Sequence, residues 1–172
     1  GLTKEHRNTI GVYPLKGKLM NVRDVTVGKI SENKEINDIK RILGLESNKK
    51  YTSETIKTEL RYGKVVFLTD QDLDGIHIRG LCINMFDCQW HTLLEENGFI
   101  GYLNTPVIKA KKGKKEVAFY NENDFREWSK TNTDNWNIKY YKGLGTSTGK
   151  EFSEYFKPMK IIDYKYEESS KD

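Results

Sequence analysis

Cysteine and long apolar runs are scarce in this sequence of 172 residues. Its two cysteines, Cys82 and Cys88, lie six positions apart in a segment of helical periodicity, so they fall on different faces and neither resembles half of a disulfide or of a zinc site. No run of about 18 or more apolar residues occurs, and the first residues, GLTKEHRNTI, lack the apolar core of a signal peptide. These absences exclude a disulfide-stapled scaffold and a membrane-spanning helix. We therefore expect a soluble protein of a reducing, intracellular compartment with no membrane partner.

The composition is that of an ordered globular protein. Charged residues make up 31% and hydrophobic residues 36%, while ten tyrosines and three tryptophans supply aromatic surface for a core. The formal net charge is only +4, so the positions of the basic residues are more informative than their total. No internal repeat is present, and the length predicts one domain.

Hydrophobic periodicity predicts a mixed α/β fold. The segment GVYPLKGKLMNVRD suits a surface loop that leads into a strand, and the next periodic stretch predicts a helix with Ser31 as its N-cap and Gly44 as its stop. The expected later elements are a strand at 64–68 buried on both faces, a long buried helix at 76–95, a hairpin of strands 99–110 and 116–120 around KKGKK, a helix at 124–129, a strand at 137–141 and a helix at 147–156. This order places an acidic turn at the carboxyl end of a central strand, where open sheets bind their ligands.

The acidic turn lies in VVFLTDQDLDGIH, where an apolar strand ends in Asp70, Asp72 and Asp74. Three carboxylates this close repel one another, and the repulsion grows as the site loses water. A divalent cation removes the conflict, and oxygen ligands of this kind suit a hard ion such as Mg²⁺, which binds one or two carboxylates together with waters and substrate phosphates. The turn therefore predicts a metal site.

Three other interpretations of the acidic turn are possible. In a noncatalytic scaffold Asp70 and Asp74 would cap the helix and Asp72 would be solvated. An EF-hand calcium loop is rejected, because its twelfth position would be Leu81 instead of a glutamate and a strand precedes it. A phosphatase-like Asp-x-Asp domain, with Asp70 as the nucleophile, remains an alternative, although it needs a later acidic pair that the sequence does not show.

A glycine-rich segment, KYYKGLGTSTGK, follows the predicted strand at 137–141. It is not a P-loop, because Leu144 stands where the spacing requires glycine and Glu151 where it requires serine or threonine. Its exposed amides and Lys142 could bind an anion, and a solvated loop is an equally good interpretation.

A second basic segment, PLKGKLMNVR, groups Lys16, Lys18 and Arg23 around Gly17, with Asn21 as a further donor. Basic side chains on a chain that glycine allows to approach a surface closely are suited to a phosphodiester backbone. The KKGKK segment is interpreted as a solvated tip instead.

Together these segments resemble the TOPRIM domain of a type IIA DNA topoisomerase of the eukaryotic or large-virus kind. The resemblance rests on YPLKGKLMNVRD, EINDI, LRYGKVVFLTDQDLDGIHIRGL and YYKGLGTSTGKE with EYF after it, in the family's order over essentially the whole chain. Ile76, where the family usually has serine, and Lys16, where arginine is common, are departures. Another TOPRIM enzyme, a primase or nuclease, is the alternative, but it would lack PLKGKLMNVR and YKGLGT.

The resemblance implies a Rossmann-like, mostly parallel sheet flanked by helices. Residues 1–157 would form the TOPRIM domain, and residues 158–172 a tail leading toward the DNA-gate region. The family's first strand ends in Glu-Gly-Asp-Ser, whose glutamate is a metal ligand. That motif does not occur here, so we expect an N-terminally incomplete domain that is inactive alone.

The resemblance also assigns roles to individual residues. Asp70 and Asp72 would be direct Mg²⁺ ligands, Asp74 a closer or water-mediated ligand, and His77 a catalytic residue beside the scissile phosphate, unless that histidine merely packs at the helix start. Mn²⁺ or Ca²⁺ could replace Mg²⁺ in binding. The implied DNA-binding residues are Lys16, Lys18, Asn21, Arg23, Lys142, Gly143 and Gly145.

The function that the resemblance implies is the metal-binding part of a DNA cleavage and religation core. The full enzyme would be an ATP-dependent type II topoisomerase that passes one duplex through a transient double-strand break. Its partners would be double-stranded DNA, the remaining domains of the same polypeptide, one of which uses ATP, and a second subunit in a homodimer. We expect a nuclear location in a eukaryotic cell, or a viral replication site in the cytoplasm.

Overall fold

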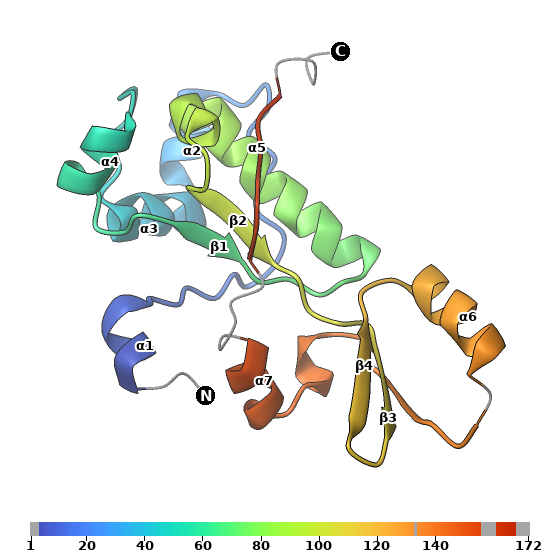
Figure 1. The fold of residues 1–172 in the computed structure, drawn as a ribbon. Coiled ribbons are helices and arrows are strands. Elements are labelled where there is room, and N and C mark those ends of the chain that lie inside the picture. Colours follow the sequence, from blue (N-terminus) through green and yellow to red (C-terminus); the bar gives the residue numbers. More distant parts are fainter. Residues whose placement is uncertain (1–3, 133, 156–160, 168–172) are drawn as a thin grey trace.

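Two three-stranded sheets form the framework of the computed structural model, which describes residues 4–132, 134–155 and 161–167, the side chain of Phe152 excepted (Figure 1). The first sheet has the order β1-β2-β6 and the second the order β4-β3-β5. The strands are β1 (Val65–Phe67), β2 (Ile100–Leu103), β3 (Ile108–Lys112), β4 (Lys115–Phe119), β5 (Asn137–Tyr140) and β6 (Ile161–Asp163). The helices are α1 (Lys4–Thr9), α2 (Val27–Glu32), α3 (Lys34–Leu43), α4 (Ser53–Glu59), α5 (Leu73–Glu95), α6 (Glu122–Thr131), the 3₁₀ turn η1 (Leu144–Thr146) and α7 (Gly149–Tyr155).

The first sheet confirms the α/β class but is less parallel than expected. β1 pairs in parallel with β2, with Val65 opposite Ile100, and β6 joins β2 in antiparallel register. The other two pairings, β3 with β4 and β3 with β5, are antiparallel. Within the described residues β1 lies at an edge rather than in the centre, and its three residues are half-buried, so a central strand covered on both faces was a wrong prediction.

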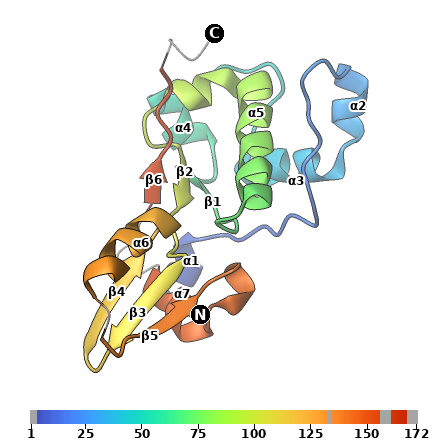
Figure 2. The same ribbon diagram turned by 90° about the vertical axis from the view of Figure 1, so that its right-hand side faces the viewer.

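The main core lies between this sheet and the helices α3 and α5, which occupy the same side of it in Figure 2. Met85, Phe86 and Leu93 of α5 are almost completely buried. Burial of such side chains contributes about 1.5–3 kcal/mol each, so α5 is the central packing element of the fold.

The helix predicted from Ser31 to Gly44 is two helices. α2 ends before Asn33, whose side chain accepts a 3.0 Å hydrogen bond from the amide of Ile36 and caps α3. Ser31 lies inside α2, where its hydroxyl donates to the carbonyl of Gly28, so its assignment as the N-cap was wrong. Gly44 ends α3 in the left-handed conformation with φ of 78°, as predicted.

The loop before α2 does not lead into a strand as expected. It passes directly into α2, whose N-cap is Thr26. Leu19 and Val22 of this loop are each only 3% exposed, so the loop is anchored in the core although its basic side chains face solvent. Alternation of apolar and basic residues in an anchored loop explains why the sequence resembled the approach to a strand.

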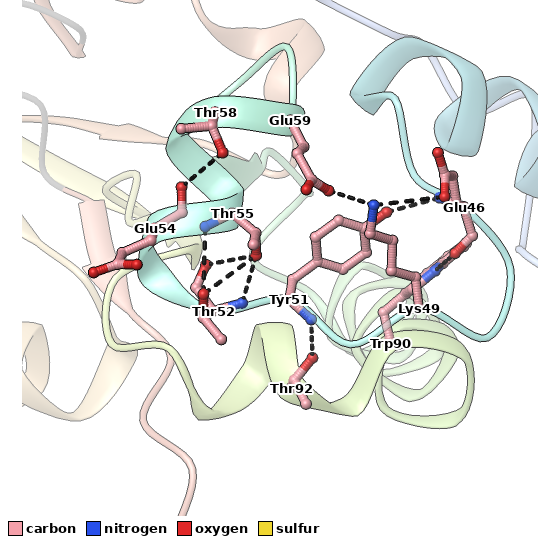
Figure 3. A network of polar contacts seen from close by, with 10 residues as sticks. All are labelled: Glu46, Lys49, Tyr51, Thr52, Glu54, Thr55, Thr58, Glu59, Trp90 and Thr92. Carbon is pink, nitrogen blue, oxygen red and sulfur yellow. Dashed lines mark hydrogen bonds and ion pairs between the residues drawn. The ribbon is translucent and has the colours of Figure 1, made fainter.

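The far end of α5 carries a polar network, shown in Figure 3. The amide of Tyr51 donates to Thr92 Oγ1 over 2.9 Å, and the Tyr51 hydroxyl accepts from the amide of Glu46 over 2.8 Å. Trp90, where the helix is kinked, donates from Nε1 to the carbonyl of Glu46. Lys49 forms ion pairs with Glu46 and Glu59. These contacts fix α4 and the loop before it against α5.

The second sheet contains the predicted hairpin, but the first of its strands was predicted too long. Residues 99–110 divide into β2 and β3, which belong to different sheets. The break falls at Pro106, which has no amide hydrogen to donate to a ladder. β3 and β4 form the hairpin around Gly113, whose φ is 59°, and α6 covers one face through contacts of Phe125 and Trp128 with Phe119.

The helix at 124–129, the strand at 137–141 and the last helix are confirmed to within a few residues as α6, β5 and α7. Cys82 is a buried free thiol and Cys88 an exposed one. No helix in the described part of the chain combines the length and apolarity needed to cross a membrane.

Candidate metal and nucleic-acid site

The acidic turn follows β1 and runs into the first turn of α5, whose second residue is Asp74. Gly75, in the first turn of this helix, lies against the backbone of Asp70 so closely that a Cβ atom there would be 2.0 Å from the Asp70 carbonyl oxygen. No other residue type fits this position without moving backbone atoms. The DGIH sequence therefore sets the tight strand-to-helix turn that presents the carboxylates.

Asp70 joins the acidic turn to the glycine-rich turn after β5. Its Oδ1 accepts a 2.6 Å hydrogen bond from the amide of Leu144, and a Cβ on Gly143 would lie 3.1 Å from its Oδ2. Gly143 itself is extended, with φ of 179°, so any residue could adopt its backbone conformation. Glycine suits this position because the Asp70 carboxylate approaches it closely. The structure thus brings Asp70, a predicted metal ligand, together with Gly143, a predicted DNA-binding residue.

Asp72 and Asp74 have different partners. Asp72 is the N-cap of α5 and accepts a 2.7 Å hydrogen bond from the amide of Gly75. Asp74 is exposed and forms a 3.4 Å ion pair with Lys18. The interpretation in which Asp70 and Asp74 are the caps and Asp72 is solvated is therefore wrong.

The three carboxylates are chemically suited to a hard cation without forming a preassembled cage. In the described ranges, no group of three or more histidine, cysteine, aspartate or glutamate side chains is close enough together to hold a metal ion. The hydrogen bonds to Asp70 and Asp72 each use Oδ1. Mg²⁺ binds one or two carboxylates and completes its shell with water and phosphate oxygens. Asp70 and Asp72 fit that requirement, and the exposed pair of Asp74 with Lys18 is weak enough to exchange.

His77 lies on α5 three residues after Asp74, and its side chain is exposed rather than packed at the helix start.

The basic loop lies beside the start of α5. Lys16, Lys18 and Arg23 are exposed, and Lys18 is joined to α5 through Asp74. Asn21 Oδ1 accepts from the side-chain amide of Asn84, a second link to the same helix. The loop predicted to bind phosphate and the acidic turn therefore share one region of the surface.

Glu151, which was not among the predicted site residues, contacts residues on both flanks of the glycine-rich turn. Glu151 accepts hydrogen bonds from Lys139 Nζ at 2.9 Å and from Thr148 Oγ1 at 3.2 Å. Burial raises the pKa of its carboxyl, but hydrogen bonds from Tyr141 and Lys139 outweigh burial and leave this pKa below its ordinary value. Burial, followed by the hydrogen bond to Glu151, raises the pKa of Tyr141.

Lys142, Gly143 and Gly145 thus sit on a turn held by Asp70 at one point and by the Glu151 cluster at another. Lys142 and Gly145 are exposed. The spacing of Lys139, Tyr141 and Glu151 across a strand, a turn and a helix gives no recognisable sequence signal, which is why Glu151 was missed.

Two family models match the chain. The model of the Toprim domain matches residues 2–106, and the model described as the C-terminal associated domain of TOPRIM matches residues 103–172. The chain belongs to the Toprim family, as the sequence motifs indicated. The overlap of the two matches falls between β2 and β3, where the first sheet gives way to the second.

The most similar relatives include eukaryotic type II topoisomerases. The chain is 48% identical to DNA topoisomerase 2-alpha of Rattus norvegicus over 96% of its length and to DNA topoisomerase 2 top-2 of Caenorhabditis elegans over its full length. A solved structure of the DNA-binding, cleavage and re-ligation domain of Plasmodium falciparum topoisomerase II matches with a TM-score of 0.79 and 45% identity, covering 88% of this chain and 21% of that one. The chain spans only 11% and 12% of the two curated relatives.

Proposed function

We propose that this chain is the metal-binding part of the DNA cleavage and religation core of an ATP-dependent type II DNA topoisomerase. The observation that carries the proposal is the meeting of Asp70 with the glycine-rich turn at the start of α5, beside the basic loop of Lys18, in a chain 48% identical to enzymes named DNA topoisomerase 2. The full enzyme passes one duplex through a transient double-strand break in another.

In this proposal Asp70 and Asp72 hold Mg²⁺ directly, and Asp74 is a closer or water-mediated ligand. Bound Mg²⁺ supplies charge stabilisation at the departing 3′ oxygen and orients the phosphodiester for in-line attack. The amides of Leu144 and Gly75 orient the two carboxylates by holding Oδ1 of each. His77 donates a hydrogen bond to the scissile phosphate. Mn²⁺ or Ca²⁺ can occupy the same ligands.

The DNA backbone is bound from two sides of the acidic turn. Lys16, Lys18, Asn21 and Arg23 contact phosphates from the basic loop. Lys142 and the amides of Gly143 and Gly145 contact them from the glycine-rich turn. Such contacts position the duplex and do not read its sequence.

The remaining machinery lies elsewhere in a longer polypeptide. The nucleophilic tyrosine, the ATPase and the rest of the DNA gate belong to other domains, and the enzyme is a homodimer acting in the nucleus, or at a cytoplasmic replication site if the source is viral. We assign residues 1–157 to the domain and residues 158–172, part of which lie outside the described ranges, to a segment leading toward the DNA gate, although β6 within that segment pairs with β2 in the first sheet.

The first sheet has an apolar cavity beside β1. A cavity of about 380 Å³ borders β1 and is lined largely by apolar side chains, including Val12, Leu15, Ile39 and Phe86. In the described chain the outer edge of β1 has no neighbouring strand.

The proposal is tested in the full-length protein with supercoiled plasmid, Mg²⁺ and ATP. Asp70→Asn and Asp72→Asn are close in shape to the wild type, and asparagine caps helices as well as aspartate does, so both variants keep the fold. We expect loss of DNA cleavage with ATP hydrolysis largely intact. Unchanged cleavage in both variants would refute the metal assignment.

A further inference from the structure

The first turns of α5 present a helical face whose four residues are all exposed. These residues, spaced i, i+3, i+4 and i+7, are Leu73, Ile76, His77 and Gly80, and we call them the exposed stripe of α5. Leu73 is 85% exposed and Ile76 48% exposed, although both are large apolar side chains. Leu73 immediately follows the metal-ligand candidate Asp72.

The exposed stripe differs from an ordinary solvated helix face. Such a face usually carries charged side chains, and the stripe has no aspartate, glutamate, lysine or arginine. A glycine inside a helix costs about 1 kcal/mol relative to alanine, yet nothing lies within 4 Å of the Cβ position at Gly80, so packing within the described chain does not require glycine there. Both features are explained if a ligand approaches this face closely.

The packing of α5 does not use the stripe. Other side chains of the helix, among them Cys82, Met85 and Phe86, supply its contacts with the core. The helix would therefore keep its place in the fold with polar residues at Leu73 and Ile76.

Charges around the stripe indicate what covers it. Lys18 is paired to Asp74, which lies between Leu73 and Ile76 in sequence, and the turn that carries Lys142 is tied to Asp70 by the amide of Leu144. Two basic segments are thus fixed at the start of the same helix. A polyanion that contacts both segments would run along the start of α5, the part of the helix that carries Leu73 and Ile76.

We propose that the exposed stripe of α5 packs against the groove wall of duplex DNA, with Leu73 and Ile76 on deoxyribose and base edges and Gly80 admitting the backbone of one strand. This inference rests on the proposed function, because it assumes that the basic loop and the glycine-rich turn bind DNA. Apolar contacts with base edges depend on sequence, unlike phosphate contacts. The stripe therefore makes Leu73 and Ile76 determinants of the preferred cleavage sequence.

The test uses the full-length protein carrying Leu73→Gln and Ile76→Ser together, with Val27→Gln as the control. Val27 is 82% exposed on α2 and belongs to neither basic segment. The affinity for a duplex oligonucleotide is measured at several salt concentrations, and cleavage sites are mapped on a plasmid. We expect the double variant to bind about tenfold more weakly, with an unchanged dependence of log K on log salt and a redistributed set of cleavage sites, whereas the control behaves as wild type.

A second variant, Gly80→Gln, keeps the fold because the position is open, and we expect it to weaken DNA binding in the same way. If both variants bind DNA with the affinity of the wild type and cleave at the same sites, the inference is overturned. The proposed function still stands in that case, provided that the wild-type protein cleaves DNA. Lower thermal stability of the full-length protein with unchanged DNA affinity would also overturn the inference, because the stripe would then be covered by another domain. Failure of the wild-type protein to bind or cleave DNA would instead refute the proposed function.

Discussion

The amide of Leu144 donates a 2.6 Å hydrogen bond to Oδ1 of Asp70, although the two residues are 74 positions apart in the sequence. Asp70 lies in the turn between β1 and α5, and Leu144 begins the 3₁₀ turn after β5. The bond therefore couples the two sheets at the carboxylate that we assign to the metal. Orientation of a ligand by such a bond normally has a large effect on metal affinity.

A methyl group at Gly143 tests this coupling. Gly143→Ala places a Cβ 3.1 Å from Asp70 Oδ2, so the carboxylate has to shift. Because partners of metal ligands affect affinity by about tenfold or more, we expect DNA cleavage by the full-length enzyme to require about tenfold more Mg²⁺. Gly28→Ala, on α2 with no atom within 4 Å of the new Cβ, is the control and should leave the Mg²⁺ dependence unchanged. A normal Mg²⁺ dependence in Gly143→Ala would show that the turn does not orient Asp70.

The close packing of Gly75 predicts that alanine substitutions at Gly75 and Gly80 change the free energy of unfolding in opposite directions. Gly75→Ala forces a Cβ to within 2.0 Å of the Asp70 carbonyl oxygen, and overpacking of this kind costs about 1–3 kcal/mol. Gly80→Ala, five residues farther along the same helix, meets no atom and gains up to about 1 kcal/mol from helix propensity. Urea unfolding followed by tryptophan fluorescence should give opposite signs for the two variants. Equal effects would contradict the tight turn that presents the carboxylates.

The basic loop is tested through salt dependence. Lys18→Ala should weaken DNA binding regardless of sequence and reduce the slope of log K against log salt by about one, because one phosphate contact is lost. The measurement is a fluorescence anisotropy titration of the full-length protein with duplex DNA at several salt concentrations. A changed base preference with an unchanged slope would contradict the phosphate-contact role.

Burial of the Cys82 thiol predicts that the free energy of unfolding depends on pH in the alkaline range. Burial raises the pKa of Cys82 from 9.0 to about 11. Between these values the folded state keeps the proton that the unfolded state releases, so the free energy of unfolding falls as pH rises, by up to about 1.4 kcal/mol per pH unit from this group. Cys82→Ala should remove that part of the slope and lower the free energy of unfolding near neutral pH, where the thiol is protonated in both states. At pH 8 a thiol reagent should label Cys88 readily and Cys82 only after unfolding, and equal labelling rates would contradict the burial.

Local patterns predicted most of the elements but not their partners. The strand at β1, the long helix α5, the β3–β4 hairpin, α6, β5 and α7 follow from apolar spacing and from turn residues such as Gly113. The assignment of residues 99–110 to one strand failed, because strand periodicity continues through Pro106 while the chain changes sheets there. The N-cap at Ser31 failed because Ser31 lies inside α2, which Thr26 caps, and Asn33, an equally good capping residue, ends α2 and caps α3.

In the candidate site too, the local motifs could be predicted from the sequence and the contacts between them could not. The carboxylates, the basic loop and the glycine-rich turn were visible as motifs, since each is a run of neighbouring residues. The bond from Leu144 to Asp70 and the cluster around Glu151 join residues far apart in the chain, and only the tertiary fold brings them together. Asp72 as the cap of α5 was missed because all three aspartates precede or start the helix at spacings that permit capping.

The most direct test of the metal assignment is a titration of the full-length protein with Mn²⁺, without nucleotide, followed by electron paramagnetic resonance. The wild-type protein should bind Mn²⁺ in competition with Mg²⁺, and Asp70→Asn combined with Asp72→Asn should abolish that binding while circular dichroism stays unchanged. Equal Mn²⁺ affinity and stoichiometry in the wild type and the double variant would contradict the account.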